Sequence, residues 1–257
     1  MKVVILAGGH GTRLMEVTNV KPKPMVEIGD MPIIWHIMKI YYYYGYSEFV
    51  ICLGYKGEII KNFFKSYYLN YNDFTVDTFS NKTIIHNKRN EKWKITLVDT
   101  GLNSMTGSRI SKIQKYTDKK PFFLTYGDGL SNINIHKLLE FHKNQKTACT
   151  VTAVKPEGRF AVLNIDDKNI VNEFQEKNKK HVDWINGGFF VCEQNIFQYL
   201  DDTDNLIWER KPLETLAKEG QLSAYKHDGF WQPMDTLKDK TYLNKLWSSN
   251  KAKWRLW

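Results

Sequence analysis

A glycine-rich turn near the N-terminus is followed closely by a basic side chain. Residues 3–6 form an unbroken apolar run of the length expected for a buried parallel strand, and Gly8, Gly9 and Gly11 come next. Glycine lets the backbone approach a ligand closely and present successive N–H groups to an anion. Arg13 adds a planar fork of donors suited to phosphate. The pattern predicts a phosphate-binding loop, although an ordinary tight turn after a strand has the same glycines.

A lysine–proline segment follows this loop. Pro22 and Pro24 exclude a regular helix and favour an extended chain. Residues two apart in an extended chain point the same way, so we expect Lys21 and Lys23 on one face. One of the two lysines is expected to face the glycine loop.

Two aspartates follow aromatic strands in distant parts of the chain. Asp128 lies between Gly127 and Gly129, directly after the apolar run 121–126. That place is the carboxyl edge of a parallel sheet, where α/β enzymes bind ligands and where a carboxylate near a nucleoside triphosphate suits Mg²⁺. Asp128 could also be an exposed turn residue. Asp235 precedes an amphipathic helix and could be its N-cap.

The spacing excludes two common phosphate loops. The Walker pattern, Gly-x-x-x-x-Gly-Lys-Ser/Thr, does not occur in the sequence. The dinucleotide fingerprint Gly-x-Gly-x-x-Gly fails because Leu14 stands where the third glycine should be. The second expected strand, residues 49–53, also lacks the acidic residue that would bind a ribose. A nicotinamide-dependent enzyme is therefore not expected.

Residues 6–14, with the lysine–proline segment behind them, resemble the signature of the sugar nucleotidyltransferases, also called nucleotide-sugar pyrophosphorylases. Within that family the chain is most similar to the cytidylyltransferases that act on glucose 1-phosphate. The resemblance implies CTP and glucose 1-phosphate as substrates, CDP-glucose and pyrophosphate as products, and Mg²⁺ as cofactor. The choice of CTP rests on the resemblance alone. There are two alternatives. The protein could be a pyrophosphorylase for another base or sugar phosphate, with dTTP or UTP as donor, or a sensor that binds nucleotide sugars without turnover.

The resemblance also implies site residues. The nucleotide-binding set is Leu6, Ala7, Gly8, Gly9, His10, Gly11, Thr12, Arg13, Lys23, Ser104, Thr106, Gly107, Arg109, Gly127 and Asp128. The sugar-phosphate-binding set is Gly129, Arg159, Glu176, Lys177, Asn186, Gly187 and Gly188. Arg13, Lys23 and Asp128 are implied in catalysis, and Asp128 and Asp235 in binding the metal.

Simpler interpretations exist for parts of these sets. Residues 104–109 could merely cap the helix that follows them. Glu176 and Lys177 could be a solvated turn. The chain departs from the family pattern at Asn178, where proline is usual, and this weakens the assignment of Lys177.

The implied reaction needs no general base. A phosphomonoester has a second pKa of about 6, so it is mostly dianionic and nucleophilic near neutral pH. Catalysis then requires in-line alignment of the sugar phosphate with the α-phosphorus, and neutralisation of charge on the departing pyrophosphate. We expect the glycine loop and Arg13 to hold the triphosphate, Lys23 to contact the α-phosphate, and Lys177 to align the acceptor.

The elements that position these residues alternate between strand and helix. Apolar spacing predicts strands over 3–6, 49–53, 121–126, 148–154, 184–191 and 222–226, and helices over 33–44, 58–64, 110–116, 135–144, 213–218 and 237–247. Short alternating runs at 74–79, 83–86 and 93–98 predict a hairpin excursion, and 158–165 with 170–177 a second strand pair. We expect an α/β fold with a Rossmann-like, mostly parallel sheet flanked by helices, the nucleotide-diphospho-sugar transferase type, with β-hairpin insertions.

The whole chain is expected to form one domain, residues 1–257. Residues 1 to about 130 would be the nucleotide-binding half, and the remainder, from about 131 to 257, the sugar-phosphate-binding half.

Composition limits the possible partners. The formal charge of +9 comes from scattered lysines and arginines without a long basic run, so we expect no nucleic acid partner. No apolar stretch is long enough to span a membrane, and the first strand leaves no room for a signal peptide. Cys52, Cys149 and Cys192 lie apart in apolar runs, as buried thiols of a cytoplasmic protein would. The tyrosine run 41–44 cannot all face inward, which favours a homo-oligomer.

Overall fold

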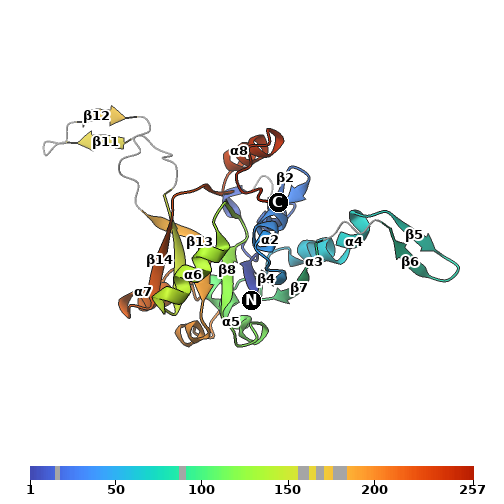
Figure 1. The fold of residues 1–257 in the computed structure, drawn as a ribbon, viewed down its shortest axis with the longest axis horizontal. Helices are drawn as coiled ribbons and strands as arrows, with labels where there is room; N and C mark the ends of the chain where they lie inside the picture. The colour runs from blue at the N-terminus through green and yellow to red at the C-terminus, as the bar shows by residue number, and fades with distance from the viewer. Residues whose placement is uncertain (15–17, 87–90, 156–161, 166–170, 176–183) are drawn as a thin grey trace.

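A twisted central sheet organises the chain. The computed structural model describes residues 1–14, 18–86, 91–155, 162–165, 171–175 and 184–257 (Figure 1). Among them, seven strands pair in the order β14-β10-β13-β8-β1-β4-β7. β13 is antiparallel to both of its neighbours, and the other pairs are parallel. The strands are β1 (Val3–Leu6), β4 (Glu48–Leu53), β7 (Lys94–Asp99), β8 (Phe122–Tyr126), β10 (Cys149–Val154), β13 (Ile185–Cys192) and β14 (Leu222–His227).

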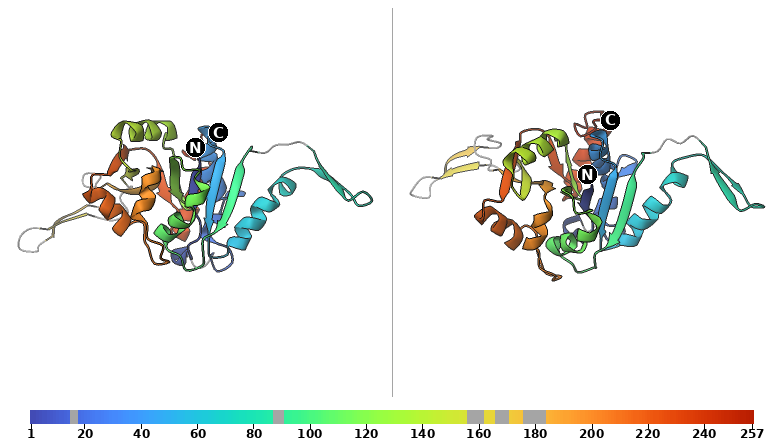
Figure 2. Two further views of the ribbon diagram at one scale, coloured as in Figure 1. Left: turned by 90° about the horizontal axis from the view of Figure 1, so that it is seen from below. Right: turned by 60° about the horizontal axis from the view of Figure 1, so that its bottom comes forward.

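Helices cover both faces of this sheet (Figure 2). Val3 and Ile5 of β1 point to one side, where they join a core with α2 (Ile33–Tyr43), α3 (Gly57–Lys65), α6 (Ile135–Gln145) and α8 (Leu237–Ser248). Val4 and Leu6 point to the other, toward α5 (Thr106–Lys112) and α7 (Lys211–Lys218). Alternate residues of a strand face opposite sides of the sheet, so a continuously apolar strand needs helices on both faces to bury its side chains. The predicted α/β fold with a mostly parallel sheet is confirmed.

Two hairpins project from the body at opposite ends (Figure 1). β5 (Phe74–Asp77) pairs with β6 (Lys82–Ile85), and β11 (Val162–Ile165) pairs with β12 (Val171–Gln175), both antiparallel. These confirm the expected insertions. The run 93–98 was wrongly placed in the first hairpin, because it forms β7 and pairs in parallel with β4 in the main sheet. A half-buried edge strand alternates in polarity just as a hairpin strand does.

Short elements connect the larger ones at the sheet's edge. They are β2 (Glu27–Ile28), β3 (Met31–Pro32), β9 (Gly129–Ser131), β15 (Trp231–Pro233), α4 (Tyr67–Asn70), and the 3₁₀ turns η1 (Thr12–Leu14), η2 (Lys23–Met25), η3 (Gln114–Tyr116) and η4 (Gln194–Tyr199). The turn η2 corrects the expectation of an extended lysine–proline segment. Pro22 is extended, but the chain tightens directly after it. α5 also begins at Thr106, earlier than predicted.

The C-terminal tryptophans pack against the start of α2. His36 is fully buried there, and the rings of Trp247 and Trp254 lie at 4.7 and 6.2 Å from its own. Its Nε2 lies 2.9 Å from the carbonyl oxygen of Ile28, and its Nδ1 accepts from the indole of Trp254 at 3.4 Å. Because an indole can only donate, the imidazole is neutral with its proton on Nε2. Burial lowers the pKa of His36 to about 4.

The cysteines are buried, and the tyrosine run is divided between core and surface, as the sequence predicts. Cys52, Cys149 and Cys192 are buried free thiols. Of the tyrosine run, Tyr41 is fully buried and Tyr43 is exposed. Within the described ranges, no helix is both long enough and apolar enough to cross a membrane.

Candidate active site

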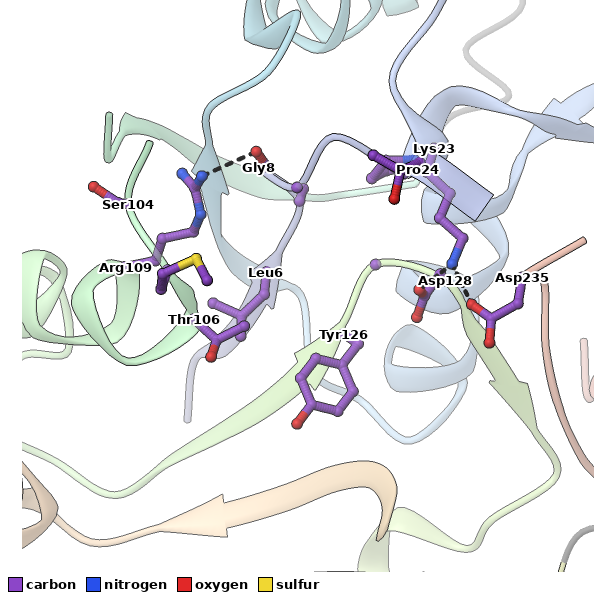
Figure 3. Close-up of a pocket in the computed structure, with 16 residues that line it drawn as sticks. Leu6, Gly8, Lys23, Pro24, Ser104, Thr106, Arg109, Tyr126, Asp128 and Asp235 are labelled. Atoms are coloured by element: carbon purple, nitrogen blue, oxygen red, sulfur yellow. Dashed lines mark hydrogen bonds and ion pairs between the residues drawn. The ribbon is translucent and has the colours of Figure 1, made fainter. Parts of the chain in front are cut away.

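A cavity of about 350 Å³ opens at the carboxyl ends of β1 and β8 (Figure 3). Most of the nucleotide-binding set predicted from the sequence lines it, together with Asp235. The lining residues from that set are Leu6, Ala7, Gly8, Gly9, Gly11, Thr12, Lys23, Ser104, Thr106, Arg109, Gly127 and Asp128. Pro24, Met105 and Tyr126 complete the wall. Segments that are far apart in the sequence therefore meet at the predicted edge of the sheet.

Arg109 fixes the glycine loop from behind. Its side chain is buried, and its Nη2 donates to the carbonyl oxygen of Gly8 at 2.9 Å (Figure 3). A Cβ on Gly8 would overlap the guanidinium, so only glycine allows this approach. The peptide is planar and trans, so the N–H of Gly9 points away from Arg109.

The other terminal nitrogen of the guanidinium also has hydrogen-bond partners. Nη1 donates to the carbonyl oxygens of Leu53 at 2.9 Å and Gly101 at 2.8 Å, and to Oγ1 of Thr100 at 2.7 Å. Arg109 thus ties together the loops that follow β1, β4 and β7. This role is one that the sequence did not reveal, because its acceptors are mostly backbone oxygens.

The side chains of residues 104–106 do not cap α5. The N-cap of α5 is Met105, which makes no side-chain capping bond. The hydroxyl of Ser104 donates to Thr100 O at 2.6 Å, and Oγ1 of Thr106 donates to Glu209 at 2.6 Å. The simpler capping interpretation of this segment is therefore wrong.

Lys23 joins the two aspartates that the sequence singled out. Its Nζ lies 2.6 Å from Oδ2 of Asp128 and 2.6 Å from Oδ1 of Asp235 (Figure 3). Burial acts to lower the pKa of Lys23, but the charges of the two carboxylates and their hydrogen bonds outweigh burial and raise it. The ammonium is therefore firmly protonated.

Strand pairing brings the two carboxylates together. β9 begins directly after Asp128 and pairs with β15, which ends just before Met234, and the Met234 N–H donates to the carbonyl oxygen of Asp128 at 2.8 Å. The N-cap of α8 is Thr236, which forms a capping box with Asp239. The side chain of Asp235 is thus directed to Lys23 and is not the cap of the helix.

The donor set at this point suits a hard divalent cation. Two carboxylates converge on one position, and the cationic Nζ of Lys23 lies between them. Within the described part of the chain, no group of three or more His, Cys, Asp or Glu side chains could hold a metal. Mg²⁺ is commonly bound through one or two carboxylates, with phosphate oxygens and water as the other ligands. A pair of aspartates beside a cavity lined by the glycine loop fits that pattern.

Lys21 does not share the partners of Lys23. Its Nζ pairs with Glu27 at 2.8 Å near the surface. The 3₁₀ turn that begins at Lys23 separates the two side chains, so the expectation of a shared face is wrong.

A second cavity of about 350 Å³ adjoins the first, and Tyr126, Asp128 and Asp235 line both. Its other lining residues include four of the predicted sugar-phosphate set, namely Gly129, Asn186, Gly187 and Gly188. Gly188 has a φ of +78°, and a Cβ there would overlap the Tyr126 ring. The lysine and two aspartates therefore lie where the two cavities meet.

Tyr126, Glu209 and Trp231 also line the second cavity, and none of them was predicted as a site residue. The hydroxyl of Tyr126 accepts from Asn186 at 3.2 Å and donates to Glu209. The indole of Trp231 donates to Gly187 O at 2.7 Å. Tyr126 ends β8 and Trp231 begins β15, and each lies a few residues before one of the two aspartates, a signal that was available in the sequence. Glu209 lies in a connecting segment without a motif.

Some predicted residues lie elsewhere. His10 is exposed and stacks on Tyr55, with ring centroids 4.9 Å apart. Gly107 contacts Leu206, to whose carbonyl oxygen its N–H donates at 2.8 Å, and it does not line either cavity. The structure does not describe the side chain of Arg13. Three further predicted residues lie outside the described ranges altogether: Arg159, Glu176 and Lys177.

Comparison with known proteins identifies relatives. A nucleotidyl transferase family model matches residues 2–239. A glucose-1-phosphate cytidylyltransferase of Salmonella typhi is 50% identical over 258 residues, covering 100% of both chains. Two solved structures share the fold at a TM-score of 0.69. HddC from Yersinia pseudotuberculosis complexed with GMP-PN is 23% identical and covers 96% of this chain and 99% of its own. A UDP-glucose pyrophosphorylase complexed with UDP-glucose is 17% identical and covers 97% and 98%.

Proposed function

This chain belongs to the nucleotidyl transferase family, and we propose that it makes CDP-glucose and pyrophosphate from CTP and glucose 1-phosphate. The observation that carries the proposal is the position of Lys23, Asp128 and Asp235 at the junction of two cavities. A nucleotide in the first cavity and a sugar phosphate in the second would bring their phosphates together at that junction. Full-length identity of 50% to the Salmonella typhi enzyme supports the choice of substrates.

The reaction needs alignment and charge neutralisation from this chain. An oxygen of the sugar phosphate dianion attacks the α-phosphorus of CTP, and the bond to the β-phosphate oxygen breaks with its electron pair leaving on pyrophosphate. The N–H groups of the glycine loop, stiffened by Arg109, would bind the triphosphate. The Lys23 ammonium would stabilise negative charge at the α-phosphate in the transition state.

Asp128 and Asp235 would hold a divalent cation, and we propose Mg²⁺. When bound, such an ion neutralises phosphate charge and polarises the reacting phosphoryl group. The two carboxylates are separated by a long stretch of sequence, so the ion would also link the glycine-loop side of the site to the C-terminal segment.

Further assignments complete the proposal. We assign Arg13 to the departing pyrophosphate, and Arg159, Glu176 and Lys177 to the sugar phosphate. Residues up to about 130 would then bind the nucleotide, and later residues the sugar phosphate. We further propose that the protein is a homo-oligomer.

Pyrophosphate release tests the proposal. Purified protein with glucose 1-phosphate and Mg²⁺ is assayed with CTP, UTP, dTTP, ATP and GTP in turn, and the products are identified by mass spectrometry. We expect CDP-glucose from CTP at the highest kcat/KM and no release from the Asp128→Asn variant. Preference for another triphosphate would replace the base assignment. Nucleotide binding without pyrophosphate would identify a sensor and refute the enzymatic proposal.

A further inference from the structure

The carboxylate of Glu209 contacts the walls of both cavities. Its Oε2 accepts from the hydroxyl of Thr106 at 2.6 Å, and Thr106 lines the first cavity. Its Oε1 accepts from the hydroxyl of Tyr126, which lines both cavities, and Glu209 itself lines the second. Figure 3 shows the hydroxyls of Thr106 and Tyr126 directed toward the same side of the site. One carboxylate therefore joins the two walls, although the reaction itself does not use it.

The hydrogen bonds on the side of the second cavity all run toward Glu209. The backbone N–H of Gly188 donates to Oδ1 of Asn186 at 2.8 Å, so the other end of that amide, Nδ2, faces Tyr126. Nδ2 donates to the Tyr126 hydroxyl at 3.2 Å, and this hydroxyl directs its own proton to Glu209. An ionised carboxylate only accepts hydrogen bonds, so it fixes the direction of the whole chain.

The segment that carries Glu209 is anchored on the start of α5, beside the first cavity. The carbonyl oxygen of Leu206 accepts from the N–H of Gly107 at 2.8 Å. The backbone N–H of Trp208 donates to Oγ1 of Thr106 at 2.9 Å, which leaves the Thr106 proton for Glu209. The position of the carboxylate is therefore set by the helix whose first residues line the first cavity.

The ring of Tyr126 is held at its face as well as at its hydroxyl. A Cβ on Gly188 would lie 2.5 Å from Cδ2 of the ring, so the ring lies directly against the glycine backbone. Burial and the neighbouring carboxylate of Glu209 raise the pKa of Tyr126, so its hydroxyl keeps the proton that it donates. A change in the position of Glu209 would therefore displace a wall of the second cavity.

We propose that Glu209 is a positioning residue that couples the two cavities, so that a nucleotide bound in the first orders the wall that receives the sugar phosphate in the second. The inference rests on the proposed function, because that function assigns these ligands to these cavities. The coupling is reciprocal, so the sugar phosphate strengthens nucleotide binding by the same factor.

Binding of a nucleotide analogue measures this coupling without turnover. In α,β-methylene CTP a methylene group replaces the oxygen that bridges the α- and β-phosphorus, so the complex with glucose 1-phosphate and Mg²⁺ does not react. Isothermal titration calorimetry gives the dissociation constant of the analogue with and without glucose 1-phosphate, and the ratio is the coupling factor. We expect a factor of about ten in wild type and below about two in Glu209→Gln and Tyr126→Phe. The double variant should lose no more than either single variant, because both changes break the same chain of hydrogen bonds.

Stability measurements and a matched control separate positioning from a purely structural role. Glu209 is exposed, so water can replace its carboxylate as an acceptor, and we expect Glu209→Gln to melt at the same temperature as wild type. Glu214→Gln is the control, because Glu214 is an exposed glutamate on α7 that lines neither cavity. It should keep the coupling factor of wild type.

Pyrophosphate release by wild type is measured in parallel with CTP and glucose 1-phosphate. A wild type that makes no CDP-glucose refutes the proposed function and this inference with it. Turnover by wild type combined with a coupling factor near one, or with full coupling in Glu209→Gln, would overturn the inference alone. The same conclusion follows if Glu214→Gln also loses coupling, or if Glu209→Gln and Tyr126→Phe lose it only together with a large fall in melting temperature.

Discussion

Replacing Lys23 with methionine removes one ammonium and keeps the length of the side chain. Its Nζ lies 2.6 Å from both Asp128 and Asp235, and the three side chains are 12%, 30% and 24% exposed. Breaking a fully buried ion pair costs about 3–5 kcal/mol, whereas an exposed pair contributes about 0.2–1 kcal/mol. The partial shielding here places the loss of unfolding free energy between these limits, at about 2 kcal/mol.

In Lys23→Met, we expect the loss of turnover to be much larger than the loss of unfolding free energy would explain. Losing one preorganised charge donor from an active site costs on the order of 10²- to 10³-fold in rate. Urea unfolding measures the first effect, and kcat/KM from pyrophosphate release measures the second. A divalent cation between the carboxylates should restore part of the stability of Lys23→Met without restoring its turnover.

Lys21→Met is the matched control. Lys21 is two residues away and has one ion pair, to Glu27 at 2.8 Å, with 29% and 54% of the two side chains exposed. We expect a loss of at most about 0.5 kcal/mol and unchanged turnover. If Lys23→Met retains turnover within tenfold of wild type, or if Lys21→Met loses as much, the lysine is not the catalytic cation and the reasoning fails.

Three further predictions follow from the structure. Arg109→Lys should raise KM for the nucleotide about tenfold or more and lower the unfolding free energy by about 1–3 kcal/mol, because one ammonium cannot satisfy all the acceptors around the glycine loop. Steady-state kinetics measure the first effect and urea unfolding the second. Lowering the pH from 6.5 to 4 should reduce the unfolding free energy by about 3 kcal/mol through His36, because as the pH falls its imidazole is protonated in the unfolded chain before it is protonated in the folded chain. Urea titrations across this range should show that the unfolding free energy of His36→Gln depends less steeply on pH. Chelation with EDTA should abolish pyrophosphate release, and Asp235→Asn should require more Mg²⁺ for half-maximal rate than wild type; equal requirements would argue against Asp235 as a ligand.

Much of the fold was predictable because strand and helix periodicity dominated the sequence. Residues 3–6 and 121–126 are largely apolar runs of strand length, as expected of strands buried between two helical layers. β7 was misplaced because residues 94–97 alternate between polar and apolar types, as a hairpin strand does. Residues 23–25 tightened into a 3₁₀ turn because proline excludes an α-helix but accepts a single turn.

The residues of the site also divide into those that the sequence made predictable and those that it did not. The glycine loop and Asp128 were predicted at strand ends, and Lys23 in the lysine–proline segment behind the loop, whereas the metal-binding role of Asp235 was implied by the family resemblance. Arg109 was associated with the nucleotide through resemblance, but its role behind the loop depends on backbone carbonyls that no pattern of side chains displays. Glu209 approaches Tyr126 only through tertiary packing, so it carried no local signal.

The pairing of β9 with β15 has a consequence for fragments of the protein. Asp128 directly precedes β9 and Asp235 follows β15, so the two carboxylates meet through a contact between segments that are far apart in the sequence. A fragment that lacks β15 would keep the glycine loop, Lys23 and Asp128, but it would lose the second carboxylate that we propose for the metal.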